Sequence, residues 1–158
     1  MKCLNLGCGN DYKVSTDVYE WTNLDMGSCK KDVEWDIEKF PLPFKHGVFG
    51  YILAQHILEH INRENFPKLV EDLYRISADK CVWHVMVPSP LSDNYFTDFT
   101  HKNPMGTRIF DYFDDSKPLR ENGIIYGYGH IHLNAQCTVV DNPPNGPDHH
   151  YQIIVDKS

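Results

Sequence analysis

Apolar residues along the chain gather in short runs of strand length, separated by polar or glycine-rich turns. Residues 2–6, 21–24 and 33–37 form three such runs, and residues 49–54 form a continuous one of the kind buried on both faces of a sheet. A further run, residues 81–87, is stopped by a Pro-Ser-Pro sequence. We therefore predict five strands in this part of the chain.

One segment between these strands has helical spacing instead. From Arg63 to Ser77 the apolar positions recur every three or four residues, with Asn62 as a plausible N-cap; they are Phe66, Leu69, Val70, Leu73 and Ile76. A second, shorter helix is possible at Thr107–Phe113. Strands that alternate with a helix favour an α/β fold with a parallel sheet.

The last part of the chain has the pattern of a hairpin. Two β runs, residues 130–140 and 151–156, flank a connection rich in Pro and Gly. We predict a single domain over residues 1–158: a minimal Rossmann-like, mostly parallel sheet ending in an antiparallel C-terminal hairpin. In open sheets of this kind, ligands bind beyond the carboxyl ends of the strands, so residues at those ends are the candidates for a site.

Composition narrows the function only a little. The net charge is −7, which argues against binding to phosphate backbones and makes nucleic acid an unlikely partner. No apolar run approaches the ~20 residues that span a bilayer, and no signal-peptide pattern opens the chain, so we expect a cytoplasmic protein without membrane contact. The five cysteines form no C-x-x-C pair and are expected to be reduced.

Three successive predicted strands end in residues suited to a nucleotide-like ligand. The first ends in Gly7-Cys8-Gly9-Asn10, where glycines let backbone N–H groups approach a ligand, although the third glycine of a dinucleotide fingerprint is absent. Asp25 ends the second strand and can accept hydrogen bonds from a ribose diol, and Asp36 lies near the end of the third. Taken singly, each of these is explained equally well as a turn or cap residue.

These stretches resemble a known family. LNLGCGN, NLDMG, WDIEKFPLPF and GYILAQHILEHI are similar, in order and spacing, to the successive motifs of class I S-adenosylmethionine-dependent methyltransferases, and most of all to the small type 11 branch. DFTHKNP, residues 98–104, resembles a stretch common after the fifth strand in that branch. The resemblance covers about the whole chain and is strongest over residues 2–61.

The resemblance implies S-adenosylmethionine as the cofactor and a small-molecule or sugar-like acceptor of its methyl group. It places the cofactor's methionine part against Gly7, Gly9 and Asn10, and its ribose against Asp25. It also places the adenine against Met26, Asp36 and Ile37, and the sulfonium near Gln55 and His56.

The chain departs from the family pattern in ways that leave other functions open. It starts at the first strand, so the helices that usually precede this strand are missing. The segment between Asn10 and Trp21 is too short for a full crossover helix, and little material remains for a lid. A non-catalytic or partner-dependent domain, whose site is closed by self-association or by a partner subunit, is therefore the alternative, as is an enzyme that cleaves the cofactor.

The stretch His56-Ile57-Leu58-Glu59-His60 also matches the H-x-x-E-H signature of inverted zinc peptidases. That interpretation needs the motif inside a long helix, with His56 and His60 as ligands, Glu59 as the base and a third ligand downstream. Glu121 is the only glutamate after Glu71 that could be this third ligand, and it lies in a predicted turn. We therefore favour a loop that leaves the fourth strand, held by hydrogen bonds of Glu59 and His60, and we predict no metal ligand set.

A methyl acceptor that must lose a proton needs a general base. His56 and His101 are the candidates, with Asp98 able to orient His101; alternatively, residues 98–104 are simply a loop held by their own hydrogen bonds. The pairs His130/His132 and His149/His150 have no third ligand at a fitting spacing, and the sequence leaves open whether they bind metal.

Overall fold

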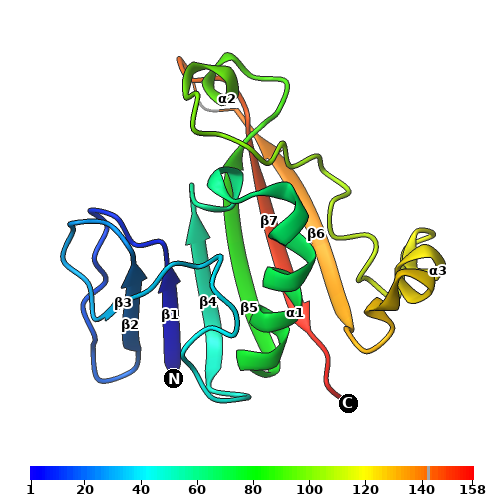
Figure 1. The fold of residues 1–158 in the computed structure, drawn as a ribbon, viewed down its shortest axis with the longest axis horizontal. Coiled ribbons are helices and arrows are strands. Elements are labelled where there is room, and N and C mark those ends of the chain that lie inside the picture. The colour runs from blue at the N-terminus through cyan, green and yellow to red at the C-terminus, as the bar shows by residue number, and fades with distance from the viewer. Residues whose placement is uncertain (142) are drawn as a thin grey trace.

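The computed structural model describes residues 1–141 and 143–158. Its centre is one seven-stranded sheet with the order β3-β2-β1-β4-β5-β7-β6 (Figure 1). The strands are β1 (Lys2–Leu6), β2 (Glu20–Asp25), β3 (Val33–Glu34), β4 (Phe49–Gln55), β5 (Ser77–Pro88), β6 (Leu133–Val140) and β7 (Asp148–Val155). Strands β1 to β5 pair in parallel, whereas β7 runs antiparallel to both β5 and β6. The predicted fold class and the antiparallel hairpin are therefore confirmed; Asn142, in the predicted hairpin connection, lies outside the described residues.

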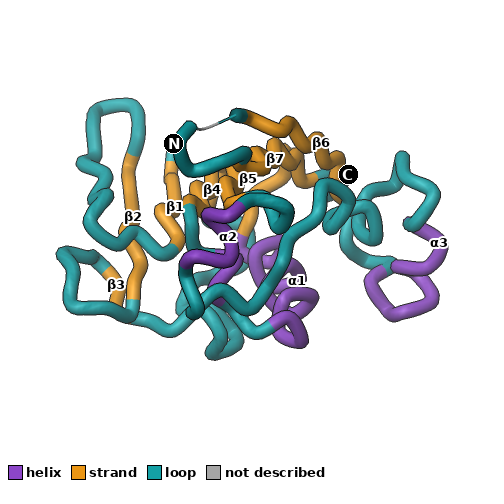
Figure 2. The backbone as a smooth tube through the Cα atoms, turned by 90° about the horizontal axis from the view of Figure 1, so that it is seen from above, coloured by secondary structure: helices purple, strands orange, loops and turns teal. Residues whose placement is uncertain are grey.

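One long helix covers one face of this sheet. Helix α1 (Phe66–Ile76) packs on β4 and β5 with the five apolar residues that the spacing predicted, and it lies on the same side of the sheet as α3 (Arg120–Gly123) (Figures 1 and 2). Its C-terminus is tied down because the Ser77 hydroxyl donates to the Leu73 carbonyl, and the indole of the buried Trp83 donates to Ser77. The helix begins at Phe66 and not at Arg63, since residues 63–65 form a separate 3-10 turn.

The predicted helix at Thr107–Phe113 is wrong. The backbone there makes consecutive turns, with Ile109 N–H donating to the Gly106 carbonyl and Phe113 N–H to the Phe110 carbonyl. Phe110 and Phe113 are both buried, so a series of turns meets the three-residue apolar spacing as well as a helix would. The short helix α2 (Asp93–Thr97), which was not predicted, lies above the carboxyl end of β5 (Figure 1).

The opposite face of β4, β5, β6 and β7 is not covered by any helix of the described residues. Polar and aromatic side chains line a shallow depression of ≈ 410 Å³ there, and the Tyr51 hydroxyl and His84 Nδ1 are 2.8 Å apart within it. The nine-residue stretch 11–19 between β1 and β2 contains no helix, as the sequence predicted. Across the described part of the chain, no helix is both long and apolar enough to cross a membrane.

Candidate functional site

The turn after β1 is shaped by its two glycines. Gly7 and Gly9 have φ values of +67° and +48°, in the left-handed region that side chains disfavour. A Cβ atom on Gly7 would come within 2.3 Å of Ile57 Cγ1, so this position needs glycine for packing against the loop after β4. A Cβ on Gly9 would meet no atom within 4 Å, so the backbone at Gly9 faces open space where a ligand can approach. Asn10, next to it, is exposed.

The carboxylate of Asp25 joins the turn after β1 to the turn after β2. Asp25 Oδ2 accepts from Gly9 N–H at 2.9 Å, and Oδ1 accepts from Gly27 N–H at 2.6 Å. Each oxygen keeps a further lone pair, so the group can still accept from a diol. Met26 beside it is 67% exposed, as expected of a side chain available to stack on a planar ligand.

Asp36 and Ile37 lie in a turn after β3 and not within a strand. The strand predicted over 33–37 ends at Glu34, and Trp35 N–H donates to the Asp25 carbonyl at 3.1 Å. Asp36 Oδ1 accepts from Glu38 N–H, which closes the turn, while Ile37 is buried. The three acidic and glycine-rich turns thus lie next to one another at the carboxyl ends of neighbouring parallel strands (Figure 1).

The chain leaves β4 through an unusual backbone conformation at His56. Gln55, the last residue of β4, is exposed, and His56 has a φ of +51°, which is uncommon for a residue with a side chain. Its N–H donates to the Met86 carbonyl of β5 at 2.8 Å, which holds the strained residue in place. Such strained conformations persist only where the surrounding structure holds them, and they cluster at functional sites.

The H-x-x-E-H stretch is a loop and not a helix. His56 lies in a bend directly after β4, and only Leu58–His60 form a single 3-10 turn. The helical geometry that the zinc peptidase interpretation requires is therefore not present in residues 56–60. Hydrogen bonds do hold this loop: His60 Nδ1 lies 3.0 Å from Thr100 Oγ1, and the backbone carbonyl of Glu59 accepts from the N–H groups of Lys102 and Asn103.

Three of the predicted site residues meet in one small cavity of ≈ 230 Å³. His56, Asp98 and His101 line it together with Glu59 and His60. His101 Nε2 lies 3.7 Å from Asp98 Oδ2, so the two side chains are neighbours but are too far apart for a hydrogen bond. A contact that the sequence did not suggest orients the ring more closely, because His101 Nδ1 lies 2.7 Å from the Tyr95 carbonyl.

Two ionisable side chains of this cavity, His56 and Asp98, have shifted pKa values. The Glu59 carboxylate, whose Oε1 lies 3.5 Å from His56 Nδ1, raises the pKa of His56 above its usual value because it favours the protonated ring, although burial opposes the shift. Hydrogen bonds from the hydroxyl and N–H of Thr100 lower the pKa of Asp98. The cavity therefore combines a carboxylate that is readily ionised with a histidine that binds a proton more tightly than usual.

The other histidines have ordinary partners. His130 Nε2 lies 2.9 Å from Glu71 Oε1, and His132 Nδ1 lies 2.9 Å from Asp115 Oδ2. The buried His149 contacts the Met105 carbonyl through Nδ1.

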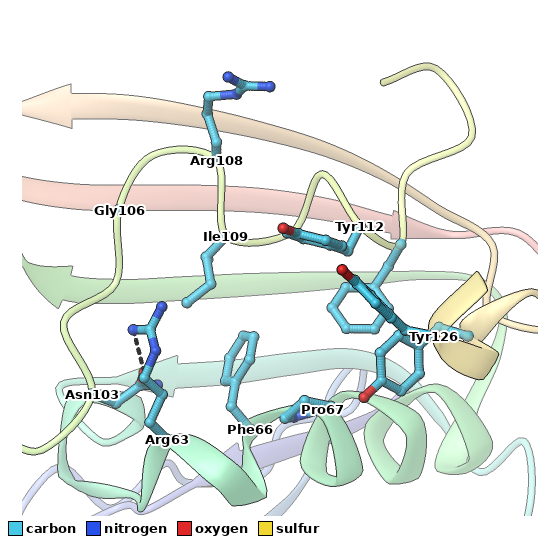
Figure 3. Close-up of a pocket in the computed structure, with 11 residues that line it drawn as sticks. Arg63, Phe66, Pro67, Asn103, Gly106, Arg108, Ile109, Tyr112 and Tyr126 are labelled. Carbon is cyan, nitrogen blue, oxygen red and sulfur yellow. Dashed lines mark hydrogen bonds between the residues drawn. The ribbon is translucent and has the colours of Figure 1, made fainter. Parts of the chain in front are cut away.

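A second cavity, of ≈ 470 Å³, lies between α1 and residues 103–128 (Figure 3). Aromatic side chains from both sides form its walls, among them Phe66, Tyr112 and Tyr126, and Arg63 and Arg108 also line it. Asn103 lines this cavity, and its side-chain amide donates to the Leu58 carbonyl of the 3-10 turn after β4. This larger cavity lies over α1 and not at the strand ends, and none of the predicted site residues lines it.

Comparison with solved structures finds this fold in S-adenosylmethionine-dependent methyltransferases. One from Archaeoglobus fulgidus matches with a TM-score of 0.64 over 98% of this chain and 86% of that one, at 16% identity. One from Methanosarcina mazei matches with a TM-score of 0.58 over 99% and 92%, at 12% identity. The [4+2]-cyclase SpnF matches with a TM-score of 0.65 over 99% and 75%, at 11% identity. No protein-family model and no curated sequence matches the chain.

The chain therefore has the fold of class I S-adenosylmethionine-dependent methyltransferases, as the sequence motifs predicted. At these identities the likeness concerns the fold alone. Because a neighbour named as a cyclase has the same fold, the reaction must be argued from the residues of the site.

Proposed function

We propose that this chain binds S-adenosylmethionine at the carboxyl ends of β1, β2 and β3 and transfers its methyl group to a small-molecule or sugar-like acceptor. The observation that carries the proposal is the arrangement of Gly9 and Asp25, with open space over the glycine and a carboxylate that keeps free lone pairs next to it. This fits a ligand that combines a ribose diol with an amino-acid part.

The residues present fit the cofactor part by part. Gly7, Gly9 and Asn10 would hold its methionine end, and Asp25 its ribose. Met26, Asp36 and Ile37 would enclose the adenine, and Gln55 would border the sulfonium. When bound, this cofactor supplies a methyl group that is already activated by the positive sulfur.

The protein's own contribution is then to align the acceptor and to remove its proton. Alignment of two reactants can lower a barrier by ~7–11 kcal/mol. His56 lies at the end of β4, directly after Gln55, and its ring lines the cavity that holds Asp98 and His101. We assign His56 as the residue that takes the proton from the acceptor, and Asp98 and His101 as residues that position the acceptor.

A partner-dependent domain is the second candidate, and the uncovered face of β4, β5, β6 and β7 favours it. Val140 on β6 and Ile154 on β7, both on this face, are 38% and 41% exposed, which is apolar surface that a partner could bury. A second copy or a partner subunit placed there would cover them. A small acceptor is supported over nucleic acid by the net charge of −7, and a cytosolic location by the five free thiols.

A methyl-transfer assay tests the proposal. Protein is incubated with S-adenosylmethionine labelled in its methyl group and with mixtures of hydroxyl- and amine-bearing small molecules, and label is followed into product. We expect transfer that His56→Ala reduces by about 10²–10⁴-fold, the usual contribution of a general base, while His130→Ala, at an exposed ion pair far along the chain, leaves it unchanged. Release of labelled methanol or of cleaved cofactor without an acceptor would instead identify a cofactor-cleaving enzyme.

A further inference from the structure

Glu59, His60 and His101 form a cluster with the composition of a metal site. One carboxylate oxygen of Glu59 and one ring nitrogen of each histidine lie within 4.8 Å of one another. Glu59 and His60 come from the 3-10 turn after β4, and His101 from the loop after α2. The Glu59 carbonyl binds the N–H groups of Lys102 and Asn103, so the main chain itself holds the two segments together.

Hydrogen bonds fix the proton of each histidine on Nδ1. The Tyr95 carbonyl can only accept, so His101 Nδ1, 2.7 Å away, must be the donor. The Thr100 hydroxyl donates its hydrogen bond to Asp98 Oδ1 at 2.6 Å, and it therefore accepts from His60 Nδ1 at 3.0 Å. Nε2 is then the ring nitrogen left to bind a cation on each histidine, and both rings have the second hydrogen-bond partner that is typical of metal-bound histidine.

The carboxylate of Glu59 has an oxygen for which these residues supply no partner. Glu59 is 1% exposed, and its Oε2 is buried without a hydrogen bond among the described residues. Its Oε1 lies 3.5 Å from His56 Nδ1 and 4.0 Å from His101 Nε2, beyond good hydrogen-bond distance. A buried charge with an unsatisfied oxygen is costly, and in proteins it is usually paired or bound to a metal.

We propose that Glu59, His60 and His101 bind one divalent transition metal ion of the Zn²⁺, Co²⁺ or Mn²⁺ type. Two imidazoles and one carboxylate are a ligand set for such ions and leave coordination positions open. Ligands at ~2.0–2.1 Å from a tetrahedral metal lie about 3.3 Å apart. Each ligand atom therefore needs to move by only about 1 Å, a distance that side-chain rotation supplies.

Glu59, His60 and His101 line the same cavity as Asp98 and His56. A metal there would bind a hydroxyl oxygen of the acceptor and lower the pKa of that hydroxyl, whose proton would pass to His56, so an acceptor with a hydroxyl group is the preferred class. This role rests on the proposed methyltransferase function, whereas the binding of the metal does not.

Cobalt binding tests the site directly. Protein without a histidine tag is freed of metal with a chelator and titrated with Co²⁺, followed by visible absorption and calorimetry, in the absence of S-adenosylmethionine. The titrations use a Cys29→Ser background, because Cys8, Asp25 and Cys29 form the other group of three potential ligands in residues 1–141 and 143–158. The variants are Glu59→Gln and His60→Gln, with His130→Gln as the matched control, and circular dichroism checks that each is folded.

We expect one Co²⁺ per chain, displaced by Zn²⁺, with an affinity that falls at least about 100-fold in Glu59→Gln and in His60→Gln and is unchanged in His130→Gln. Should Glu59→Gln fail to fold, the half-buried His60→Gln alone decides. No binding, or binding that both variants retain, overturns the proposal. Cofactor binding is tested by a separate titration with S-adenosylhomocysteine. A protein that binds no Co²⁺ but binds S-adenosylhomocysteine would contradict only the metal site, and the reverse result would contradict only the cofactor site.

Discussion

Gly7→Ala is the substitution that most sharply tests the packing of the turn after β1. The added Cβ would lie 2.3 Å from Ile57 Cγ1, 2.7 Å from Cδ1 and 2.8 Å from Cβ, all closer than real Cβ contacts. Gly9→Ala is the matched control, because Gly9 has a similar positive φ of +48° but no atom within 4 Å of the same position. The two variants therefore share the backbone strain, and only Gly7→Ala adds an overlap.

The expected magnitudes follow from these two effects. A side chain in the left-handed region costs about 1–2 kcal/mol, and forcing an extra methyl into a packed contact costs about 1–3 kcal/mol. Gly9→Ala should thus lose about 1–2 kcal/mol of unfolding free energy, and Gly7→Ala about 2–5 kcal/mol. In a domain of this size each kcal/mol lowers Tm by about 2–4 °C, so Gly7→Ala should melt about 4–20 °C below the wild type.

Urea and thermal unfolding of four variants measure this. Ile57→Ala removes the two nearest atoms and keeps only the Cβ contact, so Gly7→Ala should cost about 1 kcal/mol less in the Ile57→Ala background than in the wild type. The reasoning is refuted if Gly7→Ala is no more destabilising than Gly9→Ala, or if the Gly7 and Ile57 substitutions are additive.

Other parts of the fold give further tests. Burial opposes ionisation of Glu38, but hydrogen bonds from Asn65 and Asn62 outweigh it and lower the pKa of its carboxyl. The ionised Glu38 therefore stabilises the fold fully above about pH 5, and this stabilisation is lost as the pH falls through the lowered pKa of the folded state. In Glu38→Gln, Tm should therefore fall less steeply at acid pH than in the wild type. An equally steep fall in both proteins would contradict this. Burial raises the pKa of Cys81 to about 11, so mass spectrometry should find it alkylated far more slowly than the part-exposed Cys29 at pH 8, and equal rates would count against it. Asp114→Ala leaves the buried Ala135 N–H without its acceptor and should cost about 1–3 kcal/mol in urea unfolding, whereas a loss below about 0.5 kcal/mol would mean that the bond contributes little.

The sheet and its helix could be predicted because their patterns are local. The spacing of Phe66, Leu69 and Leu73 decides which side of α1 is buried, and the run at 49–54 decides that β4 is central. Both follow from periodicity within one element, without knowledge of what packs against it. Boundaries were less accurate, since β5 begins at Ser77 and not at Cys81.

The helices after β5 could not be placed in the same way. Helix α2 has a signal that was available, because Ser92 is an N-cap whose side chain accepts from Tyr95 N–H. Four residues of α3 carry no comparable pattern, and the turns at 107–113 satisfy the burial of Phe110 and Phe113 through contacts with distant strands. Tertiary packing decides these segments.

For the candidate site, the order of Gly9, Asp25 and Asp36 along the chain was informative because carboxyl ends of parallel strands share one edge of a sheet. The cluster of Glu59, His60 and His101 was not predicted, because 40 residues separate His60 from Thr100 and no local pattern brings them together. Its hydrogen bonds to Tyr95 and Thr100, which fix the proton positions, are visible only in the folded chain.

The most direct test of the account is a calorimetric titration of the folded protein with S-adenosylhomocysteine, repeated on Asp25→Ala and on Asp17→Ala, an exposed acid in the loop before β2. We predict saturable binding with one site per chain, lost in Asp25→Ala and unchanged in Asp17→Ala. The absence of binding to the folded wild type, or equal binding by Asp25→Ala, would contradict the cofactor site at the ends of β1, β2 and β3.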